Sequence, residues 1–81
     1  MTRPELLEIF RKTAAEIAEK DMQSIDENRV IAELGIDSLE LLEVIGSLER
    51  DLNVRIPDDQ LVSIQTVGQL LTLVSDKLPA S

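Results

Sequence analysis

The sequence predicts an all-α fold, a small antiparallel four-helix bundle of three main helices and one short helix, with a long loop between helices I and II. Three observations support this prediction. Apolar residues recur at three- and four-residue steps in three segments, each segment is preceded by a helix-start signal, and no segment has the pattern of a strand. With 81 residues, the chain is expected to form one domain (residues 1–81) with its core at about 5–78.

The first helix is predicted for about residues 4–20. Thr2 and Glu5 have the spacing of a capping box, and Pro4 suits a first helical turn. The apolar stripe of this helix is expected to be core, and it consists of Leu6, Phe10, Ala14 and Ile17.

Residues 21–37 have no sustained period and are predicted to form the long loop, with a short helical turn inside it. Gly35 marks a turn where a positive φ costs little. Asp26 and Asn28 loosely suggest a calcium loop, but Val30 and Ile31 occupy positions that need an oxygen ligand and a glycine, so no metal site is predicted. The apolar anchors of the loop are expected to be Ile25, Val30, Ile31 and Leu34.

The second helix is predicted for Ser38 to Leu52, with Asn53 as its stop. Its start has two interpretations. If Asp37 is the N-cap, Glu40 completes a capping box and the Ser38 hydroxyl points away from the bundle; if Ser38 is the cap, its oxygen is used internally. The sequence leaves both open. The stripe of this helix comprises Leu41, Ile45, Leu48 and Leu52, widened by Leu42 and Val44.

The C-terminal third is predicted to contain an extended segment, a short helix and a last helix. The segment at 54–56 precedes Pro57, which disfavours helical angles before it, and a short helical turn follows through about Val62. Thr66 and Gln69 have capping-box spacing, and Pro79 is expected to end the last helix. The stripe there is Val67, Leu70, Leu71, Val74 and Leu78.

Composition excludes most self-contained chemistry. The chain has no cysteine and no histidine, so it lacks a thiol nucleophile and the commonest general base and metal ligand, and no enzyme is expected. A net charge of −8 repels nucleic acid and anionic membranes and favours partners with basic patches. No apolar run approaches membrane-spanning length and no secretory signal is recognised, so a cytoplasmic monomer is expected.

The stretch "LGIDSLELLEVI" at residues 34–45 resembles the modification motif of acyl carrier proteins, in which a leucine-glycine pair leads into Asp-Ser-Leu. The resemblance continues in "LERDLNVRIPDDQL" and "QTVGQLLTLV" and covers about residues 5–78. That family also has a four-helix bundle with a long first loop. The resemblance therefore implies a single acyl-carrier domain that is modified by other enzymes.

The resemblance implies that Ser38 is esterified with phosphopantetheine by a phosphopantetheinyl transferase using coenzyme A, with Asp37 positioning the site. The thiol of the arm would hold acyl groups as thioesters for a ketosynthase, an acyltransferase and other acyl-handling enzymes. It also implies partner-facing roles for Leu39, Glu40, Glu43 and Glu49, and an acyl pocket lined by Ile56, Leu61 and Leu71. For each of these residues, ordinary capping, solvation or core packing is the alternative.

Two residues depart from the pattern of fatty-acid carriers. Gly46 stands where a large apolar residue is common, and Arg50 interrupts an acidic run, so both would alter a partner-docking face. They favour a discrete polyketide-synthase carrier, with a fatty-acid-synthesis carrier as the close alternative. A peptidyl carrier is less favoured because Ile36 and Asp37 stand where that family has a second glycine or a histidine. The alternative from another class is an unmodified acidic helical adaptor.

Overall fold

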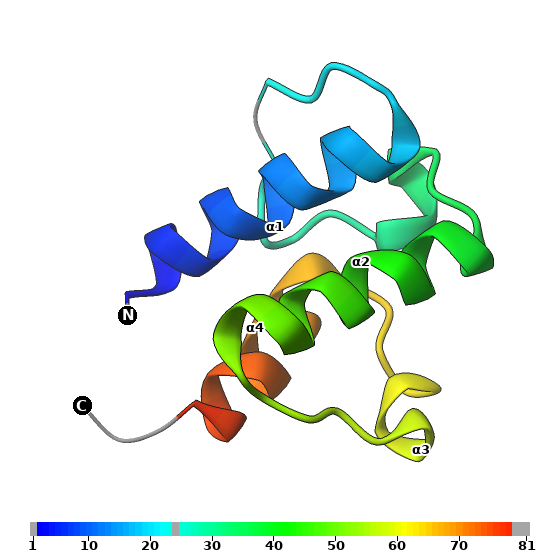
Figure 1. Cartoon of the computed structure of the whole chain (residues 1–81). Helices are drawn as coiled ribbons and strands as arrows, with labels where there is room; N and C mark the ends of the chain where they lie inside the picture. The colour runs from blue at the N-terminus through cyan, green and yellow to red at the C-terminus, as the bar shows by residue number, and fades with distance from the viewer. Residues whose placement is uncertain (1, 24, 79–81) are drawn as a thin grey trace.

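The computed structural model describes residues 2–23 and 25–78. The elements are α1 (Arg3–Ala18), the 3-10 helix η1 (Ile31–Leu34), α2 (Ser38–Leu52), α3 (Asp58–Leu61) and α4 (Val67–Lys77), in the order seen in Figure 1. The expected bounds differ from these by two residues or fewer at each end of the main helices. Pro79, expected to stop the last helix, lies outside the described residues.

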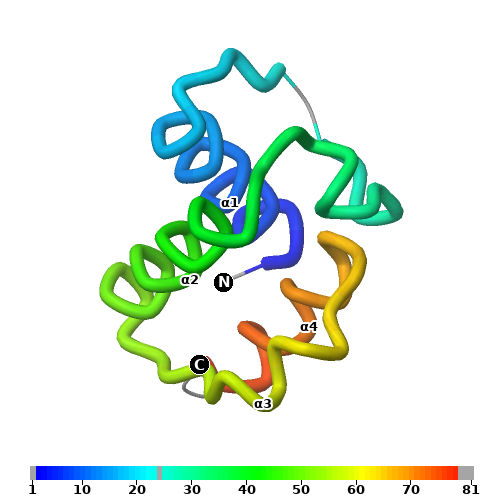
Figure 2. The backbone as a smooth tube through the Cα atoms, turned by 90° about the vertical axis from the view of Figure 1, so that its right-hand side faces the viewer, coloured from blue at the N-terminus to red at the C-terminus, as the bar shows by residue number. Residues whose placement is uncertain are grey.

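The helices form the predicted small bundle. α1 and α2 run in opposite directions side by side, and α4 packs against α1 (Figures 1 and 2). In both views the long loop after α1 arches away from the bundle before η1 leads into α2. Within the described residues, β-pairing is limited to an isolated antiparallel bridge between Val30 and Thr66, and none of the helices there has the length and hydrophobicity that a membrane span needs.

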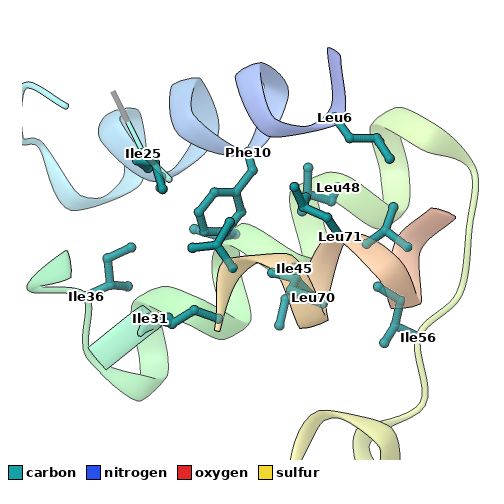
Figure 3. Packing of buried hydrophobic residues seen from close by; sticks show 14 residues of the cluster. Leu6, Phe10, Ile25, Ile31, Ile36, Ile45, Leu48, Ile56, Leu70 and Leu71 are labelled. Carbon is teal, nitrogen blue, oxygen red and sulfur yellow. The ribbon is translucent and has the colours of Figure 1, made fainter. Parts of the chain in front are cut away.

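The core is entirely apolar and is centred on Phe10, whose side chain has no exposed surface (Figure 3). Burying each large side chain stabilises the fold by about 1.5–3 kcal/mol. Leu42 was assigned to the apolar stripe of α2, but it is 53% exposed, because the buried face of α2 is narrower than the sequence pattern. The fully or nearly buried side chains are Leu6, Phe10, Ala14, Ile25, Ile31, Ile36, Val44, Ile45, Leu48, Ile56, Val67, Leu70, Leu71 and Val74.

The loop anchors are only partly as predicted. Ile25 and Ile31 are buried and Leu34 is half-buried, but Val30 is 38% exposed because its backbone, not its side chain, contacts the start of α4. Gly35 has a φ of +77°, so the expected turn is present. The Lys20 ammonium donates a hydrogen bond to the Gly35 carbonyl at 3.0 Å, which joins the end of α1 to this turn.

Backbone hydrogen bonds fasten the loop to the first turn of α4. The Gly68 N–H donates to the Glu27 carbonyl at 2.8 Å, and the Val67 N–H donates to the Arg29 carbonyl at 3.0 Å. The Arg3 guanidinium adds bonds to the Glu27 carboxylate at 2.8 Å and to the Gly68 carbonyl at 2.9 Å. The hydrogen bond from Arg3 also holds the pKa of Glu27 below its ordinary value. The loop is therefore part of the packed structure.

The two helical glycines should respond in opposite ways to alanine. A Cβ at Gly46 would meet nothing within 4 Å, so Gly46→Ala should stabilise the protein by about 0.5–1 kcal/mol through helix propensity. A Cβ at Gly68 would lie 3.1 Å from the Glu27 carbonyl oxygen, so Gly68→Ala should lower stability by loosening the loop. Urea unfolding followed by circular dichroism measures both; equal stabilisation by the two substitutions would contradict this account.

Candidate functional site

Asp37 is the N-cap of α2, which decides between the two predicted starts of this helix. Its backbone is extended, with φ −81° and ψ 175°, and its carboxylate accepts a hydrogen bond from the Glu40 N–H at 2.8 Å. In return the Glu40 carboxylate accepts a hydrogen bond from the Asp37 N–H at 3.1 Å. This capping box satisfies two backbone donors and makes no use of the side chain of Ser38, which follows Asp37.

Ser38 is the first helical residue of α2, and it is exposed. Its hydroxyl forms no hydrogen bond with any residue that the structure describes, because Asp37 does the capping. By position, the N–H groups of Ser38 and Leu39 also have no acceptor within the helix. An exposed hydroxyl at the positive end of a 15-residue helix is therefore available to carry an anionic group.

Two apolar hollows open beside Ser38 and share the side chain of Leu41. The loop hollow lies toward the long loop and is lined by Val30, Ile31, Ala32, Ile36, Asp37, Ser38, Leu41, Ile64 and Gln65. The α3 hollow lies toward α3 and is lined by Ser38, Leu41, Leu42, Asp58, Leu61 and Val62. The serine thus stands between two surfaces that can shelter an apolar chain.

Three large apolar side chains around the serine face solvent. Leu39 is 68% exposed, Leu42 53% and Val62 84%. Exposed apolar side chains gathered beside one exposed serine are typical of a surface that other molecules contact.

The six predicted partner-facing residues on α2 differ in exposure. The exposed ones are Leu39, Glu43 and Arg50, and Gly46 is half-buried. Glu40 and Glu49 are also half-buried and have structural hydrogen bonds. Glu40 completes the capping box, and the Glu49 carboxylate accepts a hydrogen bond from the Ile56 N–H at 2.8 Å. Glu49 therefore holds the segment after α2 against the helix as well as adding charge to the surface.

The three predicted pocket residues do not gather in one hollow. Leu61 lines the α3 hollow, Ile56 lines a hollow at the other end of α2, and Leu71 is 1% exposed within the core. Sequence reasoning did not assign Leu41, Leu42 or Val62 to the site. The spacing of Leu41 three residues after Ser38 could have indicated it, since residues three apart share a helix face.

The sequence matches the family described as "phosphopantetheine attachment site" over residues 8–74. It is 35% identical to the acyl carrier protein of Thermotoga maritima over 88% of this chain and 93% of that protein. The chain belongs to the acyl carrier protein family. Its cofactor is therefore phosphopantetheine, and its role is that of a carrier rather than a catalyst.

Two further comparisons support this membership. The crystal structure of the Thermotoga maritima acyl carrier protein superposes with a TM-score of 0.86 at 31% identity, covering 93% of this carrier and 88% of that chain. An anthracycline acyl carrier protein of Streptomyces sp. strain C5 is 34% identical over 95% of this carrier and 90% of that protein. Family members meet a phosphopantetheinyl transferase and acyl-handling enzymes, and the free serine with its apolar surroundings fits that use.

The free energy of unfolding can test whether Asp37, and not Ser38, caps α2. Asp37→Ala should cost about 1 kcal/mol through the lost cap, and Asp37→Asn should keep most of that stability. Ser38→Ala should be close to neutral, because the hydroxyl makes no bond within the described residues. Urea unfolding of the unmodified protein tests this, and a cost at Ser38→Ala equal to that at Asp37→Ala would contradict the assignment.

Proposed function

We propose that Ser38 is the attachment residue for phosphopantetheine and that this protein carries acyl intermediates of polyketide biosynthesis. The observation that supports the proposal is the accessibility of the Ser38 hydroxyl. It is exposed, its hydroxyl is free of the capping box, and it stands between two apolar hollows. These properties suit a residue that another enzyme must reach and esterify.

The start of α2 also suits the charge of the attached group. A phosphate ester on Ser38 would gain about 0.3–1 kcal/mol from the helix dipole and could accept hydrogen bonds from the free N–H groups there. The Asp37 carboxylate is held against the Glu40 N–H, which limits its repulsion of that phosphate. When bound, the arm supplies the thiol on which acyl groups are carried, and this agrees with a chain that has no cysteine.

The apolar side chains around Ser38 would shelter the acyl group and meet partner enzymes. Leu41 and Leu61 form the inner wall of the α3 hollow, where they can exclude water from an apolar chain. Leu39 and Glu43 are exposed on the same helix and would contact the transferase and the acyl-handling enzymes. Acidic groups in this place speed the encounter with basic partners more than they strengthen binding.

The polyketide pathway is favoured by two kinds of observation. Two of the similar carriers have anthracycline in their names, those of Streptomyces sp. strain C5 and of Streptomyces peucetius. The docking face of α2 also differs from that of fatty-acid carriers at Gly46 and Arg50. A fatty-acid-synthesis carrier is the second candidate, because identity to the Thermotoga maritima protein is 35% and to the first anthracycline carrier 34%, which does not separate them.

Intact mass spectrometry tests the attachment residue. Incubation of the unmodified protein with coenzyme A and a broad-specificity transferase should add the mass of one phosphopantetheine group. Ser38→Ala should abolish the gain, and Ser75→Ala, which removes another exposed serine, should keep it. No gain in the wild type, or a gain that survives Ser38→Ala, would sink the proposal.

Ketosynthase selectivity tests the pathway. The protein, loaded with the same acyl group, is offered to a ketosynthase of a discrete polyketide system and to one of fatty-acid synthesis. The polyketide enzyme should show the higher kcat/KM, because the face around Gly46 and Arg50 differs from that of fatty-acid carriers. Efficient turnover by the fatty-acid enzyme alone would support the second candidate instead.

A further inference from the structure

The middle of α2 has an open gap at Gly46, remote from the serine. A Cβ built at Gly46 meets no atom within 4 Å, and two surface hollows meet at this glycine and at Arg50, one turn further along. One hollow lies between α2 and α1, where Ile17 of α1 and Ser47 of α2 line it; the other faces the segment after α2. Because side chains on a helix slant toward its N-terminus, Arg50 leans toward a position that has no side chain.

A second arginine lines the same hollow. Asn53 ends α2 with a left-handed φ of 56°, and after this turn Arg55 contributes to the lining of the hollow that Arg50 also lines. Both arginines are exposed, and neither forms an ion pair with a residue in the described part of the chain. We refer to Gly46, Arg50 and Arg55 together as the arginine notch.

The two hollows also hold the carboxylates of Glu43, Glu49 and Asp58, but within the described residues none of them forms an ion pair with Arg50 or Arg55. The Glu49 carboxylate lies in the same hollow but accepts the Ile56 N–H bond at 2.8 Å, which directs it to the backbone. Asp58 lies at the rim, exposed, and makes no ion pair with either arginine within residues 2–23 and 25–78. In a chain of net charge −8, this hollow brings two unpaired guanidinium groups together with two carboxylates, so its formal charge is zero and not negative.

We propose that the arginine notch is a docking site for an acidic side chain of an acyl-handling partner enzyme. The guanidinium groups can bind a carboxylate in the two-pronged geometry that arginine favours, and the absent side chain at Gly46 leaves room for the residue that presents it. This inference rests on the proposed carrier function. It adds a requirement for negative charge on a partner, which the acidic start of α2 does not predict.

The arginine notch also gives α2 a direction that a partner can recognise. Asp37, Glu40 and Glu43 occupy the first turns beside Ser38, and Arg50 lies twelve residues after Ser38, which is about 18 Å along the helix. The matching enzyme surface is basic where Ser38 docks and carries the acidic residue about 18 Å away. Rotation of the carrier by half a turn would move the arginine notch away from that acidic residue, so the pattern favours one orientation.

The test measures Kd of the phosphopantetheine-loaded protein for a transferase, a polyketide ketosynthase and a fatty-acid ketosynthase. Arg50→Glu and Arg55→Glu should each weaken binding to at least one ketosynthase about tenfold, and Gly46→Leu should weaken the same complex by filling the gap. Arg29→Glu is the matched control: it changes another exposed, unpaired arginine and the net charge equally. Reversing the contacting acidic residue of the enzyme to arginine should restore binding to Arg50→Glu.

The outcomes separate this proposal from the one on which it rests. Loading of Ser38, read by mass, should proceed in all four variants, so a failure to load the wild type would contradict the carrier assignment alone. If Arg50→Glu and Arg55→Glu weaken every complex no more than Arg29→Glu does, the arginine notch is not a docking site. Absence of wild-type binding to both ketosynthases, despite loading, would overturn the proposal as well.

Discussion

The reciprocal hydrogen bonds between Asp37 and Glu40 are the constraint on which the site depends. They satisfy two backbone donors at the start of α2, the N–H groups of Asp37 and Glu40, without using the intervening serine. If Ser38 were the cap, its hydroxyl would point back into the helix and would have to leave that bond before it could be esterified. Because the aspartate caps the helix, local stability and access to the serine hydroxyl do not compete.

The rest of the fold holds this start in place. Val44, Ile45 and Leu48 of α2 are buried in the core that Phe10 of α1 also fills. The first turn of α2 therefore extends from a well-packed part of the helix. The long loop would otherwise leave the serine beside a mobile segment, but its bonds to the first turn of α4 and to Arg3 join it to the bundle. The loop hollow beside Ser38 therefore has one wall from α2 and one from a segment that is itself anchored.

The sequence was sufficient for the helices because their signals are local. Capping-box spacings at Thr2 and Thr66 and regular apolar stripes placed the main helices to within two residues. The cap of α2 was ambiguous because aspartate and serine are both good caps, and only the geometry shows which side chain accepts the bond. Leu42 was misplaced because the width of a buried stripe depends on the neighbouring helices. The hydrogen bond from the Ile56 N–H to Glu49, and the presence of Arg50 and Arg55 in one hollow, depend on how the chain turns after Asn53, which no periodicity reports.

The way α3 is supported has a consequence for what this protein can carry. α3 has only four residues and none of them is buried, and the nearest buried residues along the chain are Ile56 before it and Val67 after it. The residues between them are at most half-buried, among them Gln60, Leu61 and Ile64, so α3 packs against the core without contributing a buried side chain to it. Leu41, on the opposite side of the α3 hollow, belongs to α2, which packs against α1. If an acyl chain enters this hollow as proposed, a shift of α3 would make room for it without repacking around Phe10.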